Sequence, residues 1–118
     1  MSFQVNPYAE TTGTWLQGHI IVSYSQLEAL FGKPSRSDEY KISGEWVFYD
    51  DVDGEVFTLY DWKMTSLYDP DLPSVDEFRK NPLPVIFNIG GRDSAKEFIA
   101  WLESEIRSEE HTSELQSP

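Results

Sequence analysis

The chain has 118 residues, no cysteine and a formal net charge of -12. The absence of cysteine excludes a disulfide framework and a thiolate metal site. The negative charge disfavours the extended basic face that a protein needs to bind duplex DNA or RNA. No stretch approaches the roughly 20 apolar residues of a membrane span, and the N-terminus lacks the basic start and apolar run of a secretion signal. A cytoplasmic protein with no membrane partner is therefore expected.

The last twelve residues, 107–118 (RSEEHTSELQSP), match in frame the translation of a widely used sequencing-library adapter. We therefore expect residues 107–118 to be a non-natural tail, and residues 1–106 to form one domain. The tail holds one Arg and three Glu, a net -2, so residues 1–106 carry a charge of -10.

The first predicted elements are a strand and a short helix. Residues 15–22 (WLQGHIIV) are rich in β-branched residues and predict a strand. Ser23 with Gln26 three residues later is a capping-box pattern, which predicts the start of a helix. Gly32 and Pro34 are typical of its end, and a polar loop follows.

Residues 41–49 (KISGEWVFY) and 55–63 (EVFTLYDWK) both alternate with the period of a strand. The turn residues between them, 50–54 (DDVDG), predict an antiparallel hairpin. Large apolar residues occupy both faces of the second strand, so we expect that strand to be central in the sheet or covered on both sides.

The third part of the chain predicts an irregular excursion, a strand and a closing helix. Residues 64–84 are rich in proline and acids, with a possible helical turn at 75–80. Residues 85–89 (VIFNI) predict a strand that the following Gly-Gly pair breaks, and residues 94–106 predict a helix with a capping box. The order β-α-β-β-β-α indicates an α+β fold, a small antiparallel sheet with two helices.

The first candidate site is the turn before the closing helix, formed by Gly90, Gly91 and Arg92. Adjacent glycines let backbone N–H groups converge, and a helix N-terminus adds partial positive charge, so the turn suits an anion. Arg92 adds a bidentate donor for phosphate. The alternative is a tight turn from strand to helix with no ligand.

The second candidate site lies at the open end of the hairpin. Tyr60, Trp62 and Lys63 end the second strand, and the register places Tyr40 and Lys41 opposite them. Aromatic faces beside ammonium groups suit a ligand with a base and a phosphate. The alternative is a buried aromatic group covered by the apolar stems of the lysines.

Other polar residues give weaker signals. Asp50, Asp51, Asp53 and Glu55 lack the helices and the distal Glu of an EF-hand, so a solvated turn is expected. His19 is the only histidine outside the tail, which disfavours a zinc site. No nucleophile elbow is present, and we expect neither an enzyme nor a cofactor.

Three motifs, EYKxxxEW (39–46), TLYDWK (58–63) and IGG (89–91), carry a resemblance. The pattern resembles a group of small uncharacterised phage α+β proteins and covers roughly residues 20–102. Many of those proteins have an aromatic residue and a His before the Gly-Gly pair, whereas Phe87, Asn88 and Ile89 stand here. The chain therefore departs from the pattern directly before the Gly-Gly pair.

The resemblance implies a viral anti-defence protein that sequesters a nucleotide immune signal, a cyclic dinucleotide of the kind used in CBASS-type defence, without cleaving it. A small domain cannot easily enclose such a ligand, so a homodimer is expected. Two alternatives stay open: an acidic inhibitor that binds a defence protein, as anti-CRISPR and DNA-mimic proteins do, and a structural accessory of the virion. The net charge favours the acidic inhibitor, whereas the aromatic and lysine residues favour the nucleotide ligand.

Overall fold

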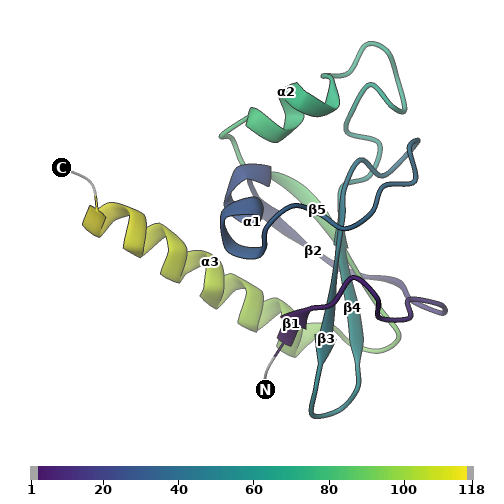
Figure 1. Ribbon diagram of the computed structural model, residues 1–118, viewed down its shortest axis with the longest axis vertical. Helices are drawn as coiled ribbons and strands as arrows, with labels where there is room; N and C mark the ends of the chain where they lie inside the picture. Colours follow the sequence, from purple (N-terminus) through teal and green to yellow (C-terminus); the bar gives the residue numbers. More distant parts are fainter. Residues whose placement is uncertain (1–2, 117–118) are drawn as a thin grey trace.

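The computed structural model describes residues 3–116, and the side chains of residues 3–110. A twisted antiparallel sheet lies beside helices that gather over one of its faces (Figure 1). This architecture confirms the α+β class and the antiparallel sheet. The strands follow the spatial order β1-β3-β4-β5-β2. In chain order the elements are β1 (Phe3–Val5), β2 (Trp15–Val22), α1 (Tyr24–Phe31), β3 (Glu45–Asp50), β4 (Val56–Tyr60), α2 (Val75–Lys80), β5 (Val85–Gly91) and α3 (Lys96–Gln116).

β2 and α1 have the predicted bounds. The Ser23 hydroxyl accepts the backbone N–H of Gln26 at 3.2 Å, and the Gln26 side chain accepts the backbone N–H of Ser23, so the predicted capping box is present. Helix α1 ends at Gly32, whose φ of 78° is a conformation that glycine adopts readily.

The predicted hairpin is also present, because β3 and β4 are antiparallel with Phe48 opposite Phe57. β4 lies between β3 and β5, which confirms the central position expected from its two apolar faces. Both strands are shorter at the open end than predicted: residues 41–44 and 61–63 lie outside the ladder. Hydrogen bonds to the Asp61 side chain and one backbone bond from Lys63 to Lys41 hold those segments instead.

Two elements extend the predicted order. β1 pairs with β3 at the edge of the sheet, and its three residues are too few to give a periodic signal. α2 forms where the helical turn at 75–80 was predicted, with a capping box between Ser74 and Glu77.

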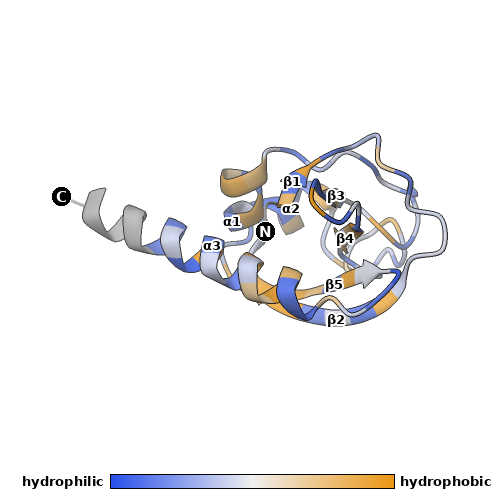
Figure 2. Ribbon diagram, turned by 90° about the horizontal axis from the view of Figure 1, so that it is seen from below, coloured by the Kyte–Doolittle hydropathy of each residue, from blue (hydrophilic) through white to orange (hydrophobic). Residues whose placement is uncertain are grey.

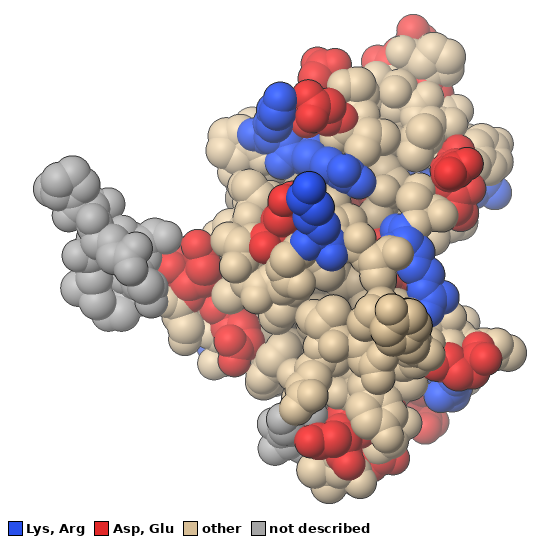
Figure 3. Space-filling view, in the orientation of Figure 1, with Lys and Arg blue, Asp and Glu red and all other residues tan. Residues whose placement is uncertain are grey.

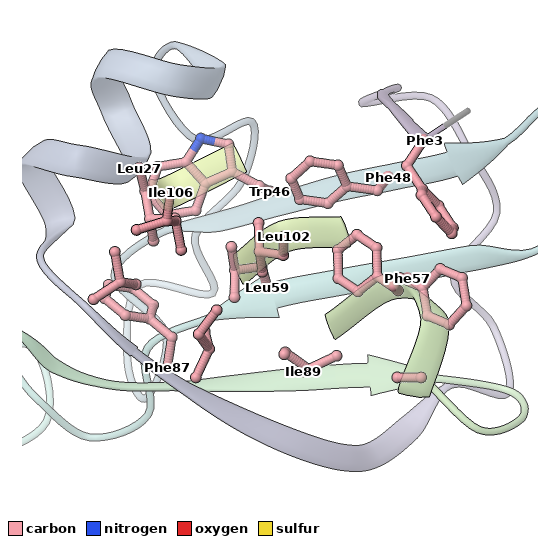
Figure 4. Packing of buried hydrophobic residues seen from close by; sticks show 14 of the residues in the cluster. Phe3, Leu27, Trp46, Phe48, Phe57, Leu59, Phe87, Ile89, Leu102 and Ile106 are labelled. Carbon is pink, nitrogen blue, oxygen red and sulfur yellow. The ribbon is translucent and has the colours of Figure 1, made fainter. Parts of the chain in front are cut away.

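The core lies between the sheet and α3 and is largely aromatic. Trp46, Phe48, Phe57 and Leu59 alternate onto the same face of β3 and β4 and are buried (Figure 4). The Phe57 ring stacks on Phe98 of α3 with centroids 4.8 Å apart. Such pairs add roughly 0.5–1.5 kcal/mol beyond the area they bury, so this stack fixes α3 against the hairpin.

Residues 6–14 connect β1 to β2, the two edge strands, and run along the opposite side of the sheet from the helices near β3 and β4. The backbone N–H of Asn6 donates to Val47 of β3, and Arg36 and Arg92 donate to carbonyl oxygens farther along this segment. The segment therefore crosses β3 and β4 between β1 and β2 (Figure 1). Val47 and Thr58, which point away from the helices, are buried, whereas Ile21 and Ile86 on the same face of β2 and β5 are exposed.

Helix α3 begins later than predicted. Ser94 was expected to form a capping box with Glu97, but its hydroxyl accepts the backbone N–H of Lys96, where the helix starts. The last core residue among the described side chains is Ile106, and beyond it α3 runs out from the sheet as a more polar helix (Figure 2). In this region Gln26 donates to Glu110 at 2.8 Å. Within the described residues, no helix combines the length and apolar character needed to cross a membrane.

Candidate functional site

The open end of the β3–β4 hairpin brings Lys41 and Lys63 together, as the register predicts. The backbone N–H of Lys63 donates to the carbonyl oxygen of Lys41 at 2.7 Å. Lys63 has a φ of 60°, a left-handed conformation that is uncommon for a residue with a side chain. Residues 62 and 63 lie beyond the end of β4 at Tyr60, where the chain turns away from the strand direction.

Five side chains form a closed set of contacts at this end, which we name the aromatic–lysine cluster: Tyr40, Lys41, Trp62, Lys63 and Tyr68. The Lys41 ammonium lies 5.4 Å from the Tyr40 ring centre and 5.5 Å from that of Trp62. The Lys63 ammonium lies 5.7 Å from the Trp62 ring centre and 5.0 Å from that of Tyr68. Tyr40 and Tyr68 complete the set with their centroids 5.6 Å apart.

The rings of this cluster are accessible. Tyr40 is 53% exposed and Trp62 is 42% exposed, so the alternative of a buried aromatic under lysine stems does not hold. The exposed parts of these two side chains are available for stacking, and the two ammonium groups near the rings are suited to a phosphate.

Asp61 lies beneath the cluster and holds its two segments together. Its buried carboxylate accepts the backbone N–H groups of Ser43 and Gly44 and the Ser43 hydroxyl, at 2.7–3.2 Å. Burial raises the pKa of Asp61, and these hydrogen bonds oppose the rise. Trp62 directly follows Asp61 in the chain, and Lys41 lies two residues before Ser43, which Asp61 binds. Asp61 is therefore placed to position these two cluster residues.

A second carboxylate fixes the loop that carries Tyr40 and Lys41. Asp38 accepts the backbone N–H groups of Tyr40 and Ile42, each at 2.8 Å. Burial acts to raise the pKa of Asp38, but these backbone donors and the charge of Lys41 outweigh it and lower the pKa. The carboxylates of Asp38 and Asp61 are thus both engaged by backbone donors.

Tyr68 was not predicted as a site residue. It lies in the irregular segment before α2, where its backbone N–H donates to Thr65 and the Ser66 N–H donates to Pro73. These bonds fold the segment back so that Tyr68 meets Tyr40 and Lys63. An aromatic residue in a proline-rich loop was the available signal, but no periodicity pointed to its partners.

Tyr60 lies at the boundary between the cluster and the sheet. It is half-buried, ends β4 opposite Asn88, and meets Trp62 edge to face with centroids 6.3 Å apart. Burial raises the pKa of Tyr60, while a hydrogen bond with Asn88 opposes the rise. Tyr60 therefore supports the Trp62 ring more than it offers a stacking face of its own.

The Gly90–Gly91 pair does not break its strand, which corrects the prediction. Both glycines belong to β5 and pair with β2 on one side and β4 on the other. A Cβ on Gly90 would lie 2.5 Å from the Thr58 hydroxyl, and one on Gly91 would lie 3.0 Å from the Phe57 ring. Glycine is required here for close packing between strands, and α3 begins only at Lys96.

Arg92 also differs from the prediction of a phosphate ligand. Its Nε donates to the carbonyl oxygen of Thr12 at 3.0 Å, and its Nη2 donates to that of Glu10 at 2.6 Å. The guanidinium thus holds the segment around residues 10–12 against the end of β5. Gly91 pairs with Phe57, about 10 Å along β4 from Tyr60, whereas the cluster lies beyond Tyr60. The two predicted sites are at opposite ends of the sheet (Figure 1).

The acidic β3–β4 turn is only partly the solvated turn that was expected. Asp51 and Asp53 are exposed, but Asp50 is 0% exposed. Asp50 ends β3 on the core face and pairs with Phe3, so β1 helps to bury it.

No model of a protein family matches the chain, and no curated protein matches it.

Proposed function

We propose that the protein binds a small anionic nucleotide at the aromatic–lysine cluster and releases it unchanged. The observation that supports this most is the placement of Lys41 and Lys63 over the rings of Tyr40, Trp62 and Tyr68. The exposed part of a ring offers a surface on which a base can stack, and the ammonium group near that ring offers a donor for phosphate.

The hydrogen bonds of Asp38 and Asp61, beside the cluster, support binding without cleavage. A general base needs a carboxylate or imidazole free to take a proton from the reacting group. Asp61 and Asp38 instead accept backbone N–H groups, and Asp61 is buried. The proposed activity is therefore sequestration.

The ligand we favour is a cyclic dinucleotide, and the role is that of a viral sponge for an immune signal in the host cytoplasm. The support for this choice is the resemblance to small phage proteins in the segments 39–46 and 58–63, which supply four of the five cluster residues. A homodimer that apposes two clusters would supply a stacking face for each base and cations for both phosphates.

The test is calorimetry of the full chain against a panel of cyclic dinucleotides, linear dinucleotides and mononucleotides, with chromatography of the recovered ligand. We expect tight binding of a cyclic dinucleotide and its recovery intact. A cleaved product would make the protein an enzyme, and no binding to any member would contradict the proposal. Light scattering with and without ligand tests the dimer separately.

A second candidate, the acidic inhibitor of a host defence protein, is favoured by the acidic end of the hairpin. Asp53 and Glu55 of the turn lie close to Asp93 and Glu97, just before and in the first turn of α3, and acidic side chains gather there on the surface (Figure 3). Such a partner would be basic and would bind this end, opposite the cluster. Charge-reversing substitutions at Asp51 and Glu97 would abolish its capture and leave nucleotide binding unchanged.

A further inference from the structure

The β3–β4 turn contains a buried carboxylate oxygen that the fold leaves unpaired. Asp50 Oδ1 accepts the backbone N–H of Val52 at 2.9 Å. Asp50 Oδ2 is buried, and it has no hydrogen-bond partner among the described residues. An unpaired charged oxygen in the interior is costly, so buried carboxylates are usually paired or bound to a metal ion.

Two further carboxylates converge on Asp50. One oxygen from each of Asp50, Asp53 and Glu55 can be chosen so that all three lie within 4.8 Å of one another. Oxygens that share one Ca²⁺ at about 2.3–2.6 Å lie at most roughly 5 Å apart. A single ion between the three carboxylates therefore satisfies the distance requirement without a change in the backbone.

The backbone of the turn holds this arrangement. The N–H of Gly54 donates to the carbonyl oxygen of Asp50, and the N–H of Asp50 donates to that of Glu55, each at 2.8 Å. Gly54 has a φ of 72°, so the chain reverses tightly and returns Glu55 to the side of Asp50. The three carboxylates are thus brought together by the closed turn.

The surroundings add negative charge. Burial, followed by the charges of the neighbouring carboxylates Asp53, Asp93, Asp50 and Glu97, raises the pKa of Glu55. Two cations lie near these acids: Lys96 lines a hollow of about 380 Å³ with Glu55 and Asp93, and Arg92 lines a second hollow with the same two acids. The side-chain ion pairs found in the described part of the chain are Arg36–Glu45 and Lys80–Asp76, and neither neutralises the turn.

We propose that Asp50, Asp53 and Glu55 bind one divalent cation, Ca²⁺ in preference to Mg²⁺. All three donors are carboxylate oxygens, the hard ligands that these ions take. Ca²⁺ accepts irregular sets of six to eight oxygens, so backbone carbonyl groups and water complete its shell, whereas Mg²⁺ demands a near-ideal octahedron. The sequence alone favoured a solvated turn, and the buried, unpaired oxygen of Asp50 is the observation that changes this interpretation.

The test is calorimetry of the full, chelator-treated chain with CaCl₂ and, separately, MgCl₂, together with thermal unfolding in each salt. We expect one Ca²⁺ per chain and a melting temperature that rises with Ca²⁺ concentration, because an ion that binds only the folded state stabilises it. Tb³⁺ gives a local readout: the Tyr49 hydroxyl lies beside Gly54, so excitation of Tyr49 should sensitise Tb³⁺ emission, and Tyr49→Phe should reduce it.

Variants separate ligation from general charge. Asp53→Asn and Glu55→Gln should each weaken Ca²⁺ binding about tenfold or more, because each replaces a charged carboxylate ligand by a neutral amide oxygen. Asp50→Asn should do the same while keeping the Oδ1 acceptor. Asp51→Asn is the matched control, since it removes the same charge from the same turn outside the set of three. No heat and no change in melting temperature at millimolar Ca²⁺ would overturn the proposal, as would equal losses in Asp51→Asn and Asp53→Asn.

Discussion

The backbone N–H of Lys63 donates to the carbonyl oxygen of Lys41 at 2.7 Å, and this bond joins the two segments that carry the aromatic–lysine cluster. It lies beyond the last pair of the β3–β4 ladder, Glu45 with Tyr60. Between the ladder and this bond, the carboxylate of Asp61 takes over the role of strand pairing by accepting the backbone N–H groups of Ser43 and Gly44. The geometry of the cluster therefore depends on one buried acid.

Asp61→Asn should destabilise the protein and weaken nucleotide binding together. The amide replaces one acceptor by an N–H₂ group that faces donors from residues 43 and 44, and a buried donor without a partner costs about 1–3 kcal/mol. Urea unfolding and calorimetry measure the two effects. Asp71→Asn, at an exposed position in the loop before α2, is the control and should change neither. A stable Asp61→Asn protein with full affinity would refute the positioning role.

Glu45 should make stability depend on pH. Burial raises the pKa of Glu45, with Arg36 at 3.7 Å opposing the rise and Asp38 adding to it. The folded state thus binds a proton more readily than the unfolded chain, whose Glu titrates near 4.5. The contribution of Glu45 to stability is largest below that value, falls as pH rises through the raised pKa, and is constant above it.

The measurement is the difference in unfolding free energy between the wild type and Glu45→Gln from about pH 4 to about pH 7. The wild type should lose stability relative to the variant as pH rises. Glu103→Gln, at an exposed position on α3, controls for the loss of one charge. A difference that stays constant or rises with pH would contradict the assignment.

Gly90→Ala should destabilise the sheet by about 1–3 kcal/mol, because overpacking a tight contact costs that much. The new methyl group would lie 2.5 Å from the Thr58 hydroxyl. Thr58→Ala removes that obstacle, so the double variant should be more stable than the sum of the two single changes predicts. Strict additivity in a double-mutant cycle would mean that Gly90 serves another purpose.

Arg92→Gln should loosen residues 6–14 without changing nucleotide affinity. Loss of the two bonds to Glu10 and Thr12 should cost on the order of 1 kcal/mol and speed hydrogen exchange in that segment. Arg92→Lys keeps the charge but not the planar fork, so it should behave nearly like Arg92→Gln. A loss of nucleotide affinity in Arg92→Gln alone would restore the phosphate role that the sequence predicts.

Local patterns predicted much of the fold. Alternation and turn residues defined the hairpin, and Ser23 with Gln26 marked the start of α1, since these signals involve residues near one another in the chain. β1 was missed because its partner strand, β3, lies far away in the sequence. The start of α3 was placed too early because Ser94 does not form the capping box that the sequence pattern predicted.

The same distinction holds for the candidate site. Lys41 and Lys63 could be paired from the hairpin register alone. The roles of Gly90, Arg92 and Asp50 could not be predicted, because Thr58, Thr12 and Phe3, which decide them, lie 32 to 80 residues away in the sequence. Tyr68 lies in a segment without periodicity, so only its tertiary contacts identify it.

The most direct test of the central claim is calorimetric titration of the best-bound nucleotide into the wild type, Trp62→Ala and Trp15→Ala. Base–aromatic stacking is worth about 1–3 kcal/mol, so Trp62→Ala should weaken binding about tenfold or more. Trp15 is 61% exposed on β2, outside the cluster, and Trp15→Ala should leave affinity unchanged. Equal affinities for the wild type and Trp62→Ala, or an equal loss in both variants, would contradict binding at the aromatic–lysine cluster.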